Sequence, residues 1–301
     1  MSPPPCSSSL KANPSRPQAR GLAWGALGML AFSVSLPVTR LAVAGGLAGS
    51  FVGIGRAAIA GVLALITLGI MRQPLPSFRL MPRLAVVAVG VVLGFPLLTS
   101  LALTHVPASH GIVVAGLLPA STAVMAVFRA GEHPSLRFWI AVLAGVACVL
   151  TFAVVQGGGS FQWADTLLLT AVVLCGLGYA EGGALARELG GVQVMCLALI
   201  MALPISVPIT LVGVDVVLLT HATPAAWAGF AYLCVVSNAG FFAWYRGLSL
   251  GGVARISQLQ LAQPVLSLVW GWLLLGEAIT GPTLVAAFGV LTCVVMAQRA
   301  R

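Results

Sequence analysis

Two charged residues, Arg56 and Glu181, lie inside long apolar stretches and are the first candidates for a chemical role. A charged side chain at membrane depth costs at least ~2.5–3.5 kcal/mol, so each must face protein or water. Arg56 could bind a carboxylate or form part of a gate; the alternatives are snorkelling to the membrane surface and bonding to carbonyls at a helix end. Glu181 could bind an amino group or carry a coupling proton; its alternative is an ion pair with an arginine near the inner membrane surface.

A polar stripe lies further along the chain and offers uncharged groups for binding. Its members are Ser257, Gln260, Gln263, Pro264, Ser267 and Trp270. Pro264 removes one helical hydrogen bond and is expected to bend its helix there, as Pro119 is expected to bend an earlier one. At about 3.6 residues per turn the members of the stripe share one face of a helix. Polar side chains in lipid seek partners, so this face points inward, and glutamine can both donate and accept hydrogen bonds. We expect the stripe to line a cavity; the alternative is that it bonds neighbouring helices together.

Aromatic and small polar residues are further candidates for lining such a cavity. Phe95, Tyr179 and Trp244 could form its apolar wall, and Ser237 shares a helix face with Trp244. The alternative for these side chains is ordinary packing. Three more candidates are Ser33, Pro37 and Thr99.

Catalytic and metal-binding arrangements are not expected. Glu132 and Glu277 are expected at helix ends, and neither has a second carboxylate or histidine on the same helical face. The five-residue spacing of His105 and His110 does not place both on one face. The six cysteines show no CxxC spacing, so they are interpreted as small packing residues. We therefore predict no catalytic residue, no metal and no cofactor. Because no GxxxxGK[ST] motif is present, any work the protein does must draw on a gradient.

The composition indicates which elements hold these residues. The chain has 301 residues, of which 59% are hydrophobic and 7% are charged, and its mean hydropathy is +1.07. Soluble domains carry roughly 25% charged residues, so lipid must be the solvent here. The net charge of +9 would suggest nucleic acid in a soluble protein. The arginines of this chain fall at the ends of apolar runs. This position favours the bilayer as the partner of the basic residues, and nucleic acid is not expected.

The apolar runs predict ten membrane-spanning helices. Each approaches the ~20 residues that cross a bilayer, and none shows the alternating polarity of a barrel strand. Residues 1–20, rich in Pro and Ser, are expected to be a disordered cytoplasmic tail. The expected spans are 21–43, 50–71, 83–105, 109–129, 136–155, 164–186, 192–213, 223–245, 253–275 and 280–298.

The basic residues predict which side each end of the chain occupies. With the N-terminus in the cytoplasm, all but Arg40 and Arg56 of the 15 basic residues fall on the cytoplasmic side. Both termini are therefore expected in the cytoplasm, which requires an even number of spans.

The chain also contains two copies of one unit. Pro119 and Glu132 recur as Pro264 and Glu277 at one constant offset (264 − 119 and 277 − 132 are both 145). We divide the chain into repeats at 21–155 and 156–298. Because each repeat holds five helices, an odd number, the second must enter the membrane from the opposite side. Inverted repeats of this kind place a binding site near the midplane, between the halves.

With its ten expected spans and two repeats, the chain resembles the ten-helix EamA-type members of the drug/metabolite transporter superfamily. Within the first expected helix, the stretch from Phe32 to Arg40 is similar to that family's W-G-S-x-F-P-x-x-R pattern. Phe32 and Ser33 stand in place of the usual Trp-Gly. Arg56 matches an arginine early in the family's second helix. Residues Tyr179 to Gly183 resemble the start of the second repeat in that family. Gly247-Leu248-Ser249, Gln263-Pro264 and Gly276-Glu277 resemble the family's signature in helices 8 and 9.

This resemblance implies a transporter of the cell inner membrane that works by alternating access, and its members include amino acid exporters. We expect export of amino acids or similar small metabolites, with protons as a candidate coupling ion. One alternative is multidrug or nucleotide-sugar transport, which is disfavoured because only Arg56 could bind phosphate within the membrane. The alternatives from other classes are an intramembrane enzyme, for which no paired nucleophile and base is found, and a non-transporting scaffold or sensor.

Overall fold

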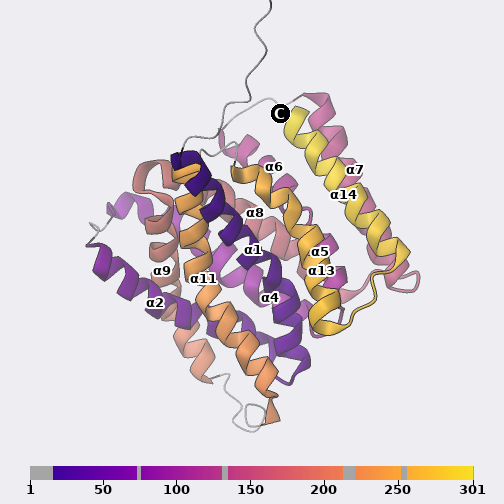
Figure 1. The fold of residues 1–301 in the computed structure, drawn as a ribbon, viewed down its shortest axis with the longest axis horizontal. Coiled ribbons are helices and arrows are strands. Elements are labelled where there is room, and N and C mark those ends of the chain that lie inside the picture. Colours follow the sequence, from indigo (N-terminus) through magenta and orange to yellow (C-terminus); the bar gives the residue numbers. More distant parts are fainter. Residues whose placement is uncertain (1–15, 73–75, 131–134, 213–220, 252–255, 301) are drawn as a thin grey trace, which may run out of the picture.

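The computed structural model describes residues 16–72, 76–130, 135–212, 221–251 and 256–300, and every regular element in them is helical (Figure 1). The α-helices are α1 (Arg16–Ala44), α2 (Arg56–Met71), α3 (Met81–Val87), α4 (Phe95–Ala102), α5 (Ala108–Ala115), α6 (Leu118–Ala130), α7 (Leu136–Gln156), α8 (Trp163–Leu189), α9 (Gly191–Val212), α11 (Pro224–Gly251), α13 (Gln263–Leu275) and α14 (Gly281–Ala300). Two π-helical segments, η1 (Phe51–Gly55) and η3 (Ala88–Gly94), and two 3₁₀ segments, η2 (Phe78–Leu80) and η4 (Ser257–Ala262), adjoin them.

Nine stretches of the described residues are long and apolar enough to cross a membrane, and a tenth apolar helix, Leu259–Leu275, is shorter. Together they correspond to the ten expected spans. The nine are Ala19–Ala44, Phe51–Met71, Phe78–Ala102, Ala108–Phe128, Leu136–Gln156, Trp163–Leu189, Gly191–Val212, Pro224–Leu250 and Gly281–Ala300.

The first helix begins earlier than expected. Residues 16–20 belong to α1 rather than to a disordered tail, while residues 1–15 lie outside the described residues.

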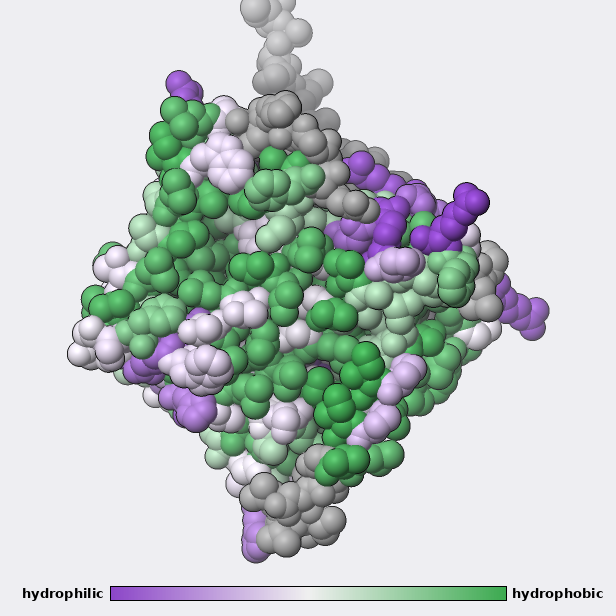
Figure 2. Space-filling view, turned by 180° about the vertical axis from the view of Figure 1, so that it is seen from behind, coloured by the Kyte–Doolittle hydropathy of each residue, from purple (hydrophilic) through white to green (hydrophobic). Residues whose placement is uncertain are grey.

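The outer surface of the bundle is apolar. Ile70 and Val285 are exposed over 78% and 74% of their surface, which suits contact with lipid rather than water. Figure 2 shows one face on which hydrophobic residues predominate and hydrophilic residues gather toward the margins.

The repeat found in the sequence recurs in the helix bounds. Helix α6 begins at Leu118 and α13 at Gln263, so the two starts lie at the same offset as Pro119 and Pro264. Each proline is the second residue of its helix. Each proline therefore lies at the start of a helix, after a break in the span. The expected bend within a continuous helix is not observed at either position. A proline at that position costs no helical hydrogen bond.

Helices from the two repeats interleave at the centre. Helix α1 packs against α11 and α13 of the second repeat, and its counterpart α8 packs against α4, α6 and η3 of the first. Helices α7 and α14 pack together at one side of the bundle (Figure 1). Helices from both halves of the sequence therefore pack together at the centre of the bundle.

Glycine permits two of these central contacts. A β-carbon added at Gly247 would lie 2.4 Å from the backbone nitrogen of Gly25, so α1 and α11 touch through their backbones. A β-carbon at Gly90 would lie 2.3 Å from the carbonyl oxygen of Leu174, where η3 crosses α8. Small residues at such crossings are the usual way in which helices approach closely in a membrane.

Candidate functional site

A cavity lies between the two repeats. It has an empty volume of about 970 Å³, counting the space continuous with the outside. Its lining comes from α1, α2, η3, α4, α5 and α6 of the first repeat and from α8, α9, α11, η4 and α13 of the second. A smaller hollow of about 350 Å³ beside Pro119 and Pro264 is lined by apolar residues and Gln260, and offers a ligand few polar contacts.

Seven of the residues proposed from the sequence line the central cavity, and they come from six elements. They are Arg56, Phe95, Thr99, Tyr179, Ser237, Gln260 and Gln263. Irregular helix precedes three of them: the π segments η1 and η3 end directly before Arg56 and Phe95, and the 3₁₀ segment η4 ends directly before Gln263. Segments of this kind are frequent at functional sites because they redirect side chains within an otherwise regular helix.

Arg56 is the charged residue of the cavity. It is the first residue of α2, it is 8% exposed, and its Nε atom is buried without a hydrogen-bond partner. No ion pair to Arg56 occurs among the described residues. Its electrostatic neighbours are the thiols of Cys175 and Cys234 and the phenol of Tyr179, which are neutral groups. A cation buried in this way is poised to bind an anion.

Gln260 and Gln263 supply the uncharged polar groups. In a 3₁₀ helix, residues three apart eclipse one another, so η4 presents Gln260 in line with Gln263, the residue that follows the segment. Both line the cavity, and within the described part of the chain neither side chain forms a hydrogen bond. Each amide therefore keeps its donors and its acceptor for a ligand.

Three of the hydroxyls that line the cavity are already committed as donors. Thr39 donates to the carbonyl of Ser35 at 2.7 Å, Thr99 to Phe95 at 2.6 Å, and Ser237 to Leu233 at 2.7 Å. What they present to a ligand is the acceptor capacity of the oxygen. An anion in the cavity can thus accept hydrogen bonds from Arg56 and the two glutamines, but not from these three hydroxyls.

Aromatic rings form one wall. The rings of Phe32 and Phe241 lie 4.7 Å apart and are tilted, and Tyr245 stacks on Phe241 at 6.4 Å. Phe95 and Tyr179 also line the cavity. This wall suits a ligand with an apolar or aromatic body.

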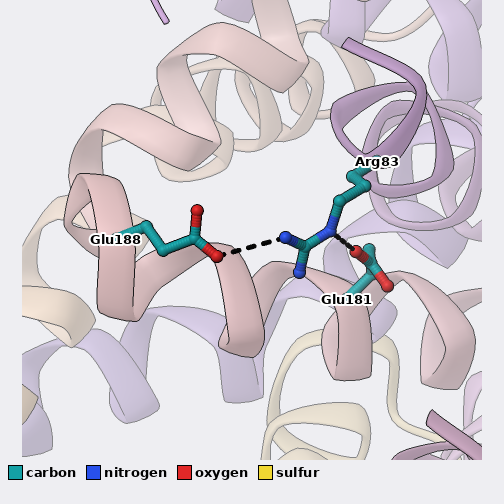
Figure 3. Close-up of polar contacts among 3 residues, drawn as sticks. All are labelled: Arg83, Glu181 and Glu188. Carbon is teal, nitrogen blue, oxygen red and sulfur yellow. Dashed lines mark hydrogen bonds and ion pairs between the residues drawn. The ribbon is translucent and has the colours of Figure 1, made fainter. Parts of the chain in front are cut away.

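Glu181 does not line the cavity. Its carboxylate accepts a hydrogen bond from Nε of Arg83, and Nη1 of the same arginine bonds Glu188 at 3.1 Å. Figure 3 shows Arg83, from α3, between the two glutamates of α8. Of the roles considered for Glu181, the geometry matches the ion pair with an arginine. The partner is Arg83, from the first repeat.

Four other proposed residues serve packing between helices. The Ser267 hydroxyl donates to the carbonyl of Ser33 at 2.7 Å, and Nε1 of Trp270 donates to the Ser33 hydroxyl at 3.0 Å. These bonds join α13 to α1 outside the cavity lining. Trp244 is buried in a cluster with Met29 and Ile256. The helical stripe therefore divides, with Gln260 and Gln263 facing the cavity and with Ser267 and Trp270 facing α1.

Two proposed residues remain. Pro37 is buried within α1 and does not line the cavity. The side chain of Ser257 lies outside the described residues, as does Glu132.

Sequence reasoning overlooked several lining residues, among them Ser35, Thr39 and Cys175. Their signal was available, because Ser35 and Thr39 are four residues apart on α1, and Cys175 stands four residues before Tyr179 on α8. A polar pair at that spacing within an apolar run marks one inward face.

Two carboxylates of the second repeat hold the start of α5. Glu277 accepts hydrogen bonds from the backbone N–H groups of Ala108 and Ser109 at 2.7 and 2.9 Å. Asp165 lies 2.6 Å from Nε2 of His110, and both side chains are buried. Glu277 is thus a helix cap, in keeping with its expected position at a helix end.

Known proteins are similar to this chain in sequence and in fold. The model of the EamA-like transporter family matches the chain twice, over residues 19–154 and 162–298. The uncharacterized transporter YdeK of Bacillus subtilis (strain 168) is 44% identical over 284 residues, covering 91% of this chain and 96% of YdeK. A crystal structure of another protein matches with a TM-score of 0.58 and 19% identity, covering 94% of this chain and 98% of its own, which shows a common fold.

Proposed function

The chain belongs to the EamA-like transporter family, a family of multi-pass membrane transporters, and we propose that it exports amino acids or similar small metabolites through the central cavity by alternating access. The observation that carries the proposal is the cavity itself. Both repeats line it, and it combines a buried cation, two free amides and an aromatic wall. Those groups match a small organic ligand with a carboxylate and an apolar body.

We further propose that the repeats are inverted and that both termini face the cytoplasm. The matched starts of α6 and α13 support the repeat, and the odd number of spans per repeat supports the inversion. The start of α1 and the end of α14 lie toward the same end of the molecule (Figure 1). The clustering of basic residues favours the cytoplasmic side for that end.

The alternatives are less well matched by the cavity. A nucleotide sugar carries two phosphates, and Arg56 is the single cation among the described lining residues. A multidrug exporter of organic cations would need a carboxylate in the cavity, and none lines its described walls. A scaffold or sensor has no use for a polar cavity shared by two repeats.

Counterflow in liposomes tests the proposal. Purified protein is reconstituted into vesicles loaded with an unlabelled compound, and entry of the same labelled compound is followed for a panel of amino acids, hydroxy acids and nucleotide sugars. The proposal expects saturable entry of at least one amino acid or small carboxylate. Entry of nucleotide sugars alone would favour the alternative, and no entry of any compound would contradict transport of small metabolites.

A further inference from the structure

We infer that the cavity selects organic anions over zwitterions of the same shape. This inference rests on the proposed function and specifies the substrate class: a carboxylate with an aromatic or apolar body and no ammonium group. The amino acids of the family resemblance would then be poorer ligands than the matching hydroxy acids.

The charge of the cavity is the first ground. Arg56 is its one charged residue within the described lining, and its neighbours are neutral thiols and a phenol. The nearby acid Glu181 is engaged by Arg83 and does not line the cavity. A zwitterion would leave the occupied cavity with the same net positive charge that it has when empty. A monoanion neutralises that charge, which low-polarity surroundings favour strongly.

The unused donors are the second ground. Four buried side-chain atoms in the described residues have no hydrogen-bond partner, on Arg56, Ser100, Ser206 and Asn238. Of these residues, Arg56 alone lines the cavity. A guanidinium offers a planar fork of donors that matches a carboxylate. Because no described protein acceptor bonds the Nε atom of Arg56, its guanidinium is the group to which we assign the anionic end of a ligand.

The remaining groups do not replace a counter-charge for an ammonium. Aromatic faces such as Phe241 attract cations, and the amide oxygens of Gln260 and Gln263 accept hydrogen bonds. These contacts are available equally to a ligand hydroxyl, which can donate to Gln260 or Gln263 without adding charge. An α-hydroxy acid thus satisfies the same polar groups as an amino acid and leaves the cavity neutral.

Three ligands with one shape test this inference. The compounds are 3-phenyllactate, phenylalanine and phenylalaninol, which at neutral pH carry net charges of about −1, 0 and +1. Equilibrium binding to purified protein and counterflow in liposomes are measured for each, with protein-free liposomes correcting for passive leak. We expect 3-phenyllactate to bind at least roughly tenfold more tightly than phenylalanine, and phenylalaninol not to bind.

Variants of Arg56 assign the preference to its charge. Arg56→Gln should reduce the ratio of 3-phenyllactate to phenylalanine affinity to about one, and Arg56→Lys should keep a preference for the anion with weaker binding. Arg79→Gln, which removes an exposed arginine outside the cavity, should behave as the unmodified protein. Size-exclusion profiles establish that each variant is folded, and Arg56→Lys retains the charge should Arg56→Gln fail to fold.

Two results would overturn the inference while leaving the proposed function intact. One is counterflow of phenylalanine as strong as that of 3-phenyllactate. The other is an anion preference that survives in folded Arg56→Gln. Absence of binding and counterflow for all three compounds, with folded protein, would contradict the inference and count against the proposed function as well.

Discussion

Nε1 of Trp270 donates a hydrogen bond to the Ser33 hydroxyl at 3.0 Å, and so ties the second repeat to the first beside the cavity. The same serine accepts, through its backbone carbonyl, a bond from Ser267 at 2.7 Å. The sequence placed all three residues in one candidate site. The structure places them in one interhelical contact, while Gln260 and Gln263 line the cavity.

Replacing Trp270 with phenylalanine should therefore affect stability more than transport. The loss of one hydrogen bond is expected to lower the free energy of unfolding by about 0.5–1.5 kcal/mol, seen as a lower apparent unfolding temperature in detergent. The half-saturation concentration in counterflow should stay unchanged. A large rise in that concentration with no loss of stability would instead place Trp270 in the binding site.

The amides should show the opposite behaviour. Gln260→Leu and Gln263→Leu are each expected to raise the half-saturation concentration by about two- to tenfold, because each removes hydrogen bonds to the ligand. Stability should not fall, since neither amide bonds the described protein. Gln298→Leu, at an exposed position on α14, is the matched control. Equal effects of the three changes would contradict a role for the cavity amides.

Glu181 provides a test of proton coupling. Because its carboxylate bonds Arg83, Glu181→Gln is expected to lower the free energy of unfolding by about 1–3 kcal/mol. Glu188 would remain as a partner of Arg83. The measurement is counterflow and gradient-driven uptake over a range of pH, which should match the unmodified protein. Loss of the pH dependence in this variant would restore Glu181 as the coupling residue.

The cap on α5 should also be measurable. Glu277→Ala leaves the N–H groups of Ala108 and Ser109 without their acceptor, and the expected loss is about 0.5–2 kcal/mol in the free energy of unfolding. Glu277→Gln keeps an acceptor oxygen and should lose less. If thermal unfolding gave the two variants equal stability, the capping role would be refuted.

The apolar runs and the duplicated Pro and Glu were enough to predict a helical membrane bundle built from two repeats. Seven lining residues could also be named, because polar side chains are rare in these spans. Partners from distant segments could not be predicted: Arg83 meets Glu181, and Asp165 meets His110, only because particular helices cross at particular depths. The breaks before Leu118 and Gln263 were not predicted, because a proline inside a long apolar run was expected to bend the helix. In this structure each proline instead lies at the start of a helix.

A steric block of the cavity tests the central claim most directly. Ala115 lines the cavity, whereas Ala239 lies exposed on α11, so Ala115→Trp and Ala239→Trp add the same side chain inside and outside it. Counterflow of the best substrate in liposomes should be abolished by Ala115→Trp and unchanged by Ala239→Trp, with both proteins folded. Transport at the unmodified rate through Ala115→Trp would contradict a substrate path through this cavity.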